Sequence, residues 1–247
     1  MGRTHEALQW AEKEFEAKRQ EGLLPKLLSE PQGSPPRKEL VGAILKPYGD
    51  LQTGLLSRYP QGSVKTMLFT GMAHGVGAST TAVNFAAAVA RNGGFKVLLI
   101  DSNLKTPSLH DVFDTEFAQG LSDFVMDGRE MLPLRAEPEN LHVICCGRLI
   151  ADPVALLGSN EFEQFLKRMR EAYDFIVLDG PPIYGSAECR MLCNRVDGVV
   201  LVIEAGKTRR HAAASAKDQV EKAGGRLLGV VINKRRYHIP EFIYKRL

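Results

Sequence analysis

Short apolar runs alternate with stretches of helical periodicity over most of this chain, from residue 66 onward. The runs are rich in β-branched and aromatic residues and span residues 66–70, 96–101, 141–145, 174–179, 198–203 and 227–232. The helical stretches span residues 79–92, 160–172, 187–195 and 209–223. Near-continuous apolar strands separated by helices are typical of a parallel sheet covered on both faces. We therefore predict an α/β fold with a mostly parallel, doubly wound sheet, in which ligands bind at the carboxyl ends of the strands.

The N-terminal part of the chain lacks this alternation. Residues 4–21 place apolar side chains at helical spacing among charged ones, which predicts an amphipathic helix. Residues 29–39 combine Pro, Gly and Ser with charge, which is typical of a linker. We therefore divide the chain into an N-terminal helical arm (1–28), a linker (29–40) and an α/β domain (41–247). Two interpretations of the arm stay open: it docks on a partner, or it packs back on its own domain.

Composition excludes several classes of protein. Hydrophobic residues make up 44% of the 247 residues and charged residues 25%, the balance of a folded domain rather than a disordered chain. The longest apolar runs are far shorter than the roughly 20 residues that cross a bilayer, and the N-terminus lacks the apolar run of a signal peptide. Four cysteines are too few for a disulfide framework. We expect a cytoplasmic protein with reduced thiols and no membrane-spanning segment.

The formal net charge of +3 hides an asymmetry. Residues 207–247 contain eleven Lys and Arg against three Asp and Glu, a net charge of +8, so the remainder carries −5. A basic segment of this kind suits an anionic partner such as nucleotide phosphates, an acidic protein or a lipid surface. The alternative is an ordinary solvated basic face.

A glycine-rich segment joins the first predicted strand to the helix that follows it. Gly71, Gly75, Gly77 and Ser79 fit the frame G-x-x-x-x-G-K-[ST] of a phosphate-binding loop, with Ala78 at the lysine position. Such a loop turns backbone N–H groups onto phosphate oxygens, and the helix N-terminus adds a favourable dipole. Because the lysine is missing, the alternative of a purely structural turn stays open.

Two further strand ends carry carboxylates. Asp101 ends one apolar strand and is followed by Asn103 and Lys105, and Asp179 ends another. Together with the glycine-rich loop they offer what a Mg²⁺–nucleotide site requires. The alternative for each aspartate is a carboxylate that caps a neighbouring helix.

The order and spacing of several segments resemble the bacterial tyrosine autokinases of capsule and exopolysaccharide biosynthesis, relatives of the MinD/ParA group of P-loop ATPases. The segments are HGVGASTTAVNFA, VLLIDSNLKTPSLHDVF, GLSDFV, DPVALLGSNEF, YDFIVLDGPPI, EAGKTRR and GVVINKRR, and they cover the chain from about residue 60 to residue 247.

This resemblance implies a nucleotide site for ATP or ADP with Mg²⁺. The implied nucleotide-binding residues are Gly75, Val76, Gly77, Ala78, Ser79, Thr80 and Asn233, with Asn233 at the adenine edge. Ser79, Asp101 and Asp179 are the implied metal-binding residues, with Asp179 as the Walker B carboxylate. Asp101 would hold a metal-bound water or accept the substrate proton, and Lys105 completes the implied catalytic set with the two aspartates.

Three features depart from the family pattern. The Walker A lysine, which contacts the β and γ phosphates, is Ala78, and its loss removes a charge-assisted hydrogen bond worth about 1.5–3 kcal/mol. Asn103 replaces the second aspartate of the usual D-x-D pair. The tyrosine-rich C-terminal segment of the family is reduced to Tyr237 and Tyr244. These departures leave enzymatic activity undecided by sequence, although a nucleotide site is still expected.

Three functional hypotheses follow. The first is an ATP-dependent protein-tyrosine autokinase of exopolysaccharide or capsule biosynthesis and export, in which Lys105, Arg209 or Arg210 supplies the missing charge. The second is a catalytically weak, nucleotide-binding regulator of a membrane polysaccharide co-polymerase. The third, a MinD/ParA-like positioning ATPase, would place a lysine where Ala73 stands.

The resemblance also implies partners and a location. The expected partner is a membrane polysaccharide co-polymerase or chain-length adaptor, with a possible second copy of this chain and no nucleic acid. We therefore expect a cytoplasmic protein that lies peripherally at the inner face of the cell membrane.

Overall fold

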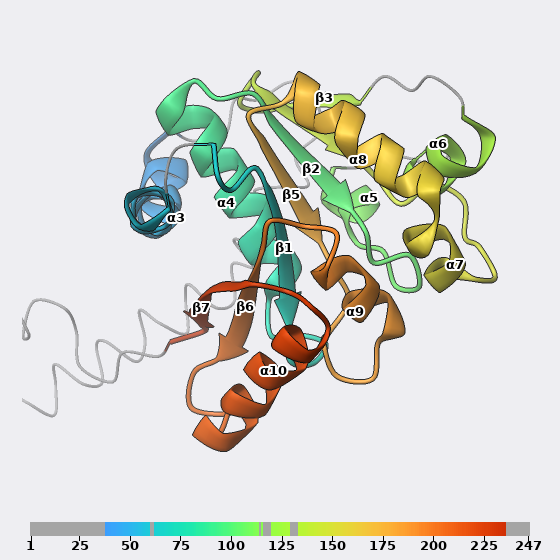
Figure 1. The fold of residues 1–247 in the computed structure, drawn as a ribbon. Helices are drawn as coiled ribbons and strands as arrows, with labels where there is room; N and C mark the ends of the chain where they lie inside the picture. Colours follow the sequence, from blue (N-terminus) through green and yellow to red (C-terminus); the bar gives the residue numbers. More distant parts are fainter. Residues whose placement is uncertain (1–37, 60–61, 114, 116–119, 129–132, 236–247) are drawn as a thin grey trace, which may run out of the picture.

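A seven-stranded sheet forms the centre of the domain (Figure 1). The computed structural model describes residues 38–59, 62–113, 115, 120–128 and 133–235, so the predicted arm lies outside the described residues. The strands are β1 (Thr66–Gly71), β2 (Val97–Asp101), β3 (Leu134–Ala136), β4 (Leu141–Ile144), β5 (Phe175–Asp179), β6 (Gly198–Glu204) and β7 (Leu227–Asn233). Their order is β3-β4-β2-β5-β1-β6-β7, and all neighbours are parallel except β3 and β4. This confirms the predicted mostly parallel sheet.

Helices cover both faces of the sheet. The longer ones are α3 (Lys38–Arg58), α4 (Ala78–Gly93), α8 (Asn160–Ala172) and α10 (Arg210–Lys222), and the shorter ones are α5 (Leu109–Val112), α6 (Leu121–Asp127), α7 (Pro153–Gly158) and α9 (Ala187–Cys193). One apolar core joins α4 and the end of α3 to one face, and a second joins α6, α7, α8, α9 and α10 to the other. Strands β1, β2 and β5 are buried throughout because both of their faces are covered.

Helix α3 was not predicted as a helix, and it begins at Lys38, inside the predicted linker. It contains Pro47 and glycines such as Gly49, residues of low intrinsic helix propensity. Its packing against α4 compensates, since a Cβ at Gly49 would lie only 2.9 Å from Asn92 Nδ2 on α4. Tertiary contact, rather than local propensity, therefore stabilises this helix.

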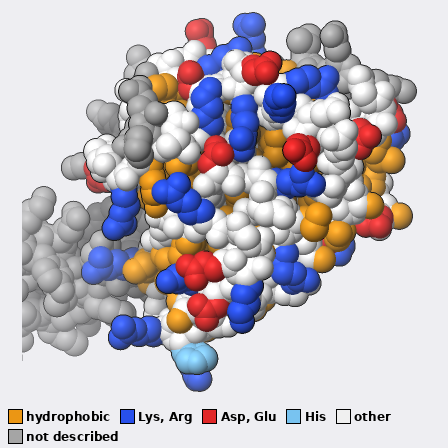
Figure 2. All heavy atoms as spheres, viewed as in Figure 1, with side chains coloured by type: hydrophobic (Ala, Val, Ile, Leu, Met, Phe, Trp, Pro, Cys, Tyr) orange, Lys and Arg blue, Asp and Glu red, His pale blue; other side chains and the backbone are white. Residues whose placement is uncertain are grey.

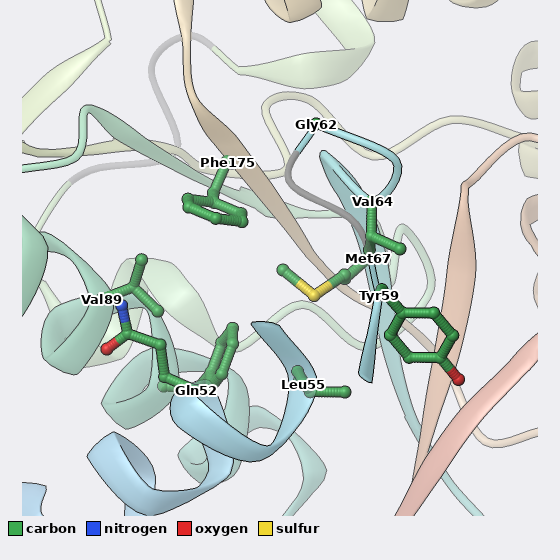
Figure 3. A pocket seen from close by; sticks show the side chains of 9 residues that line it. Gln52, Leu55, Tyr59, Gly62, Val64, Met67, Val89 and Phe175 are labelled. Carbon is green, nitrogen blue, oxygen red and sulfur yellow. The ribbon is translucent and has the colours of Figure 1, made fainter. Parts of the chain in front are cut away.

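A small apolar cavity lies where α3 meets the sheet (Figure 3). Gln52 and Leu55 of α3 and Tyr59, which directly follows α3, face Met67 of β1 and Phe175 of β5 across it. Met67 and Phe175 lie at the amino ends of their strands, so the cavity is at the opposite edge from the predicted ligand site.

The other elements absent from the prediction are short. Helices α5, α6 and α7 and strand β3 contain between three and seven residues each, which is too short to show a periodicity. Strand β3 pairs antiparallel with β4 at the edge of the sheet and is partly exposed, so it lacks the apolar character of the central strands.

The cysteines agree with the expectation of reduced thiols. All four cysteines are buried free thiols. Within the part of the chain that the structure describes, no helix combines the length and the apolar character that crossing a bilayer requires. Basic and acidic side chains are interspersed over the face shown in Figure 2.

Candidate functional site

The glycine-rich segment connects the end of β1 to the start of α4. Gly75 and Gly77 have positive φ angles of 77° and 90°, a left-handed conformation that glycine adopts without strain. Gly77 is the N-cap of α4 and offers no side-chain cap, while its carbonyl accepts the Thr81 N–H at 3.0 Å. The first N–H groups of an uncapped helix are donors suited to a phosphate. The geometry is therefore that of a phosphate-binding loop.

The end of β7 closes over this loop. Asn233 Nδ2 donates to the carbonyl oxygen of Val76 at 2.9 Å. A Cβ at Gly77 would lie 2.1 Å from the same nitrogen, so only glycine permits this approach. The structure thus places Asn233 beside the loop and gives its amide a contact with the loop backbone. The adenine contact stays a prediction.

Asp179 is the most unusual side chain at the site. It is fully buried at the carboxyl end of β5, and its Oδ1 has no hydrogen-bond partner among the described residues. Ser108 Oγ lies 3.5 Å from Oδ2. Burial and, to a lesser extent, the nearby Asp101 together raise the pKa of Asp179 to about 7, although hydrogen bonds from Ser79 and Ser108 oppose the rise. A buried carboxylate oxygen without a donor is suited to a cation.

Asp101 lies directly opposite Asp179 in the pairing of β2 with β5. One of its oxygens accepts the backbone N–H groups of Ser108 and Leu109, both at 2.9 Å, and the other accepts that of Asn103 at 3.2 Å. Burial raises the pKa of Asp101, and these three hydrogen bonds oppose the rise. In this structure Asp101 makes the contacts of a carboxylate that caps α5. Its proposed role toward metal or substrate stays a prediction.

Lys105 is held by a residue that sequence reasoning missed. Its ammonium forms an ion pair with Glu188, the second residue of α9, and Ser186 Oγ donates to Glu188 Oε2 at 2.8 Å. The Glu188 side chain is 4% exposed and that of Lys105 65% exposed. Burial alone would raise the pKa of Glu188, but the hydrogen bonds from Lys105 and Ser186 bring it below its usual value. The sequence shows only an acid six positions after the DGPP segment, and because acids are seldom buried, nothing in the sequence indicated its burial.

The residues at the strand ends fit Mg²⁺ only together with a nucleotide. Among the described residues, no group of three or more His, Cys, Asp or Glu side chains could hold a metal by itself. Mg²⁺ is usually bound by one or two carboxylates, a hydroxyl, waters and the phosphates of its nucleotide. Ser79, whose side chain lowers the pKa of Asp179, and the Oδ1 of Asp179, which has no partner among the described residues, meet that requirement.

The remaining predicted residues belong to the loop and to the first turn of α4. Val76 is buried and packs beneath it, since a Cβ at Gly71 would lie 2.4 Å from Val76 Cγ2. Ala78 is half-buried at the first turn of α4, where its side chain offers no donor or charge, and Thr80 is exposed beside it. The structure therefore brings together all seven residues assigned to nucleotide binding.

A phosphate-binding loop at the end of a central strand, with carboxylates on neighbouring strand ends, defines the P-loop NTPases. A family model described as ParA, NUBPL iron-transfer P-loop NTPase, matches residues 64–244. The tyrosine-protein kinase YwqD of Bacillus subtilis is 32% identical over 191 residues, which cover 76% of this chain and 80% of YwqD. The putative tyrosine-protein kinase CapB of Staphylococcus aureus is 30% identical over 193 residues, with 77% and 84% covered. The chain belongs to the ParA family of P-loop NTPases and, within it, to the bacterial tyrosine-protein kinases.

Solved structures support the same fold. The VpsO kinase domain is 25% identical with a TM-score of 0.71, and the match covers 81% of this chain and 98% of that domain. The kinase domain of Escherichia coli tyrosine kinase ETK has a TM-score of 0.72 at 22% identity, with 79% of each chain covered. The ETK likeness concerns the fold alone.

Proposed function

We propose that this chain is an ATP-dependent protein-tyrosine autokinase of exopolysaccharide or capsule biosynthesis and export. The kinship with bacterial tyrosine-protein kinases supports the reaction class. The single observation that carries the site assignment is Asp179, which lies near Ser79 of the phosphate-binding loop and whose buried Oδ1 finds no donor in the residues that the structure describes. A structural carboxylate would have its oxygens satisfied.

Each residue has a distinct part in this proposal. The backbone N–H groups of residues 75–80 would bind the nucleotide phosphates, and Ser79 and Asp179 would hold Mg²⁺. The bound metal would neutralise charge on the β and γ phosphates. Asp101, fixed by its three backbone donors, orients a water or receives the proton of the attacking tyrosine hydroxyl. Catalysis of phosphoryl transfer is mainly positioning and electrostatic stabilisation, so this rigid arrangement suits it.

Ala78 favours one alternative function. A P-loop without its lysine retains the backbone donors and loses a charge, so binding survives better than transfer. The alternative is accordingly a nucleotide-binding regulator of a membrane polysaccharide co-polymerase. In both functions we place the chain at the inner face of the cell membrane, with a co-polymerase or adaptor as partner and a second copy of the chain as a further partner.

Two measurements on one sample test the proposal. Calorimetric titration with ATP and ADP, with Mg²⁺ and with EDTA, should show Mg²⁺-dependent binding that Asp179→Asn weakens about tenfold or more. Asp218→Asn makes the same chemical change at an exposed position of α10 and should bind as the wild type does. Absence of binding to either nucleotide would overturn the nucleotide site. Binding without phosphotyrosine after incubation with Mg²⁺–ATP would favour the regulator.

A further inference from the structure

We propose that Lys234, at the end of β7, supplies to the nucleotide phosphates the positive charge that Ala78 does not. The inference rests on the proposed nucleotide site and adds a residue to it. Lys234 directly follows Asn233, and its ammonium donates to the carbonyl oxygen of Gly75 in the phosphate-binding loop. A cation therefore already touches the loop, although it comes from a segment 159 positions away in the sequence.

The backbone of Lys234 is arranged for this contact. Its φ of 54° is the left-handed conformation, uncommon for a residue other than glycine. Its N–H donates to Asn233 Oδ1 at 2.8 Å, while Asn233 Nδ2 donates to Val76. Neighbouring side chains of one strand end thus contact adjacent carbonyls of the loop. Uncommon backbone conformations persist where the surrounding structure enforces them, often at binding sites.

The charges around Lys234 do not neutralise the positive charge beside the loop. Glu204, at the end of β6, lies with Oε2 3.7 Å from Lys234 Nζ and Oε1 2.8 Å from Lys207 Nζ. Two lysines share one carboxylate, so the cluster has a net charge of +1 beside the loop. The Lys234 side chain is 47% exposed. Its ammonium can therefore turn toward a phosphate without first leaving a buried position.

The cations suggested by the sequence are less well placed. Lys105 is paired with the nearly buried Glu188. Arg209 and Arg210 lie at the start of α10, which packs against α9, β6 and β7. Lys234, by contrast, makes a direct contact with the loop.

Titration with ADP tests the role of Lys234. We expect Lys234→Ala and Lys234→Gln to weaken ADP binding about tenfold, and Lys234→Arg, which retains the charge, to bind within about threefold of the wild type. Lys207→Ala is the matched control, because Lys207 pairs with the same Glu204, and it should change affinity less than twofold. Adenosine carries no phosphate, so its affinity should not depend on Lys234. Equal losses for adenosine and ADP would overturn the proposal.

A double-mutant cycle separates charge from architecture. If Lys234 replaces the loop lysine, Ala78→Lys should restore ADP affinity about tenfold in the Lys234→Ala background and change it about twofold or less in the wild type. If Lys234 only fastens the loop to β7, its loss will be the same in both backgrounds, which would contradict the proposal. Unchanged ADP affinity in Lys234→Ala with a binding wild type defeats this inference alone. A wild type that binds no nucleotide defeats the proposed function as well.

Discussion

At the scale of single residues, Asp179 shows how a binding-site side chain can destabilise the folded protein when no ligand is bound. The carboxylate is buried and faces Asp101, and one of its oxygens has no donor within the described part of the chain. Its ionised form is therefore disfavoured until a cation arrives, and the affinity for Mg²⁺–nucleotide should rise with pH through the region of its pKa. Packing of the loop and of β5 does not by itself explain why a carboxylate is buried here, whereas a bound cation would.

The same residue makes folding stability depend on pH. The pKa of Asp179 is about 7 in the folded protein against an ordinary value of 3.8, so between these values the folded state binds more protons than the unfolded state. Stability should therefore fall as pH rises from about 4 to 7, with a slope of at most about 1.4 kcal/mol per pH unit from this group. Asp179→Asn should remove that contribution and be more stable than the wild type at pH 8. Urea unfolding at pH 5 and pH 8 measures it, and Asp218→Asn should keep the wild-type slope. Parallel stability curves for wild type and Asp179→Asn would refute the shift.

Unfolding measurements on single and double variants test the Lys105–Glu188 pair. Lys105→Met removes the cation from a nearly buried carboxylate and should destabilise the protein by about 1–2 kcal/mol at pH 7, less than for a fully buried pair because Lys105 is largely exposed. Adding Glu188→Gln should recover most of that loss in denaturant unfolding. Recovered stability with ATP binding and tyrosine phosphorylation still impaired would show that Lys105 also acts on the nucleotide, as predicted. Full recovery of function together with stability would show that its role is structural.

At the scale of elements, backbone contacts fix α6 to the end of β4. Leu121 N donates to Cys145 O at 2.9 Å and Ser122 N to Cys146 O at 3.0 Å. The approach requires Gly120, since a Cβ there would lie 2.1 Å from Gly147 N and 2.4 Å from Cys145 O. These are backbone atoms that cannot turn away as a flexible side chain would.

We therefore expect Gly120→Ala to destabilise the domain by about 1–3 kcal/mol through overpacking. The matched control is Gly54→Ala, in a part of α3 where a Cβ would meet nothing within 4 Å. That change should stabilise the protein by about 0.5–1 kcal/mol, because alanine loses less backbone entropy than glycine in a helix. Thermal unfolding of the two variants gives the comparison. Equal effects would mean that the contact at Gly120 relaxes without cost.

At the scale of the whole molecule, the basic segment 207–247 joins the site to the expected targets of phosphorylation. Residues 207–235 include α10, β7 and Lys234, whereas residues 236–247 lie outside the described residues. Tyr237 and Tyr244 belong to the latter group, and the nearby Lys234, Arg235 and Arg236 would pair with an added phosphate.

If the chain is an autokinase, phosphate should appear on Tyr237 or Tyr244 after incubation with Mg²⁺–ATP. Mass spectrometry locates it. Replacement of both tyrosines by phenylalanine should abolish the signal, whereas Tyr184→Phe, at a partly exposed tyrosine of the described domain, should leave it unchanged. Phosphate that persists in the double variant would place the target elsewhere.

Local patterns in the sequence were sufficient for six of the seven strands, the loop and the two carboxylates. Apolar runs and helical spacing are properties of neighbouring residues, and parallel strands necessarily bring their carboxyl ends, with Asp101 and Asp179, to one edge. The family resemblance then supplied the roles expected of these residues.

Only the tertiary structure decided the contacts that act across long separations in sequence. Helix α3 forms despite its low helix propensity because it packs against α4. Lys105 pairs with Glu188, and Lys234 donates a hydrogen bond to Gly75, because the sheet order brings separate strand ends together. No periodicity records which charged side chain will face which carbonyl, since such a contact depends on the positions of whole elements. The sequence therefore determined the class of site, and packing decided which cation stands beside its phosphate-binding loop.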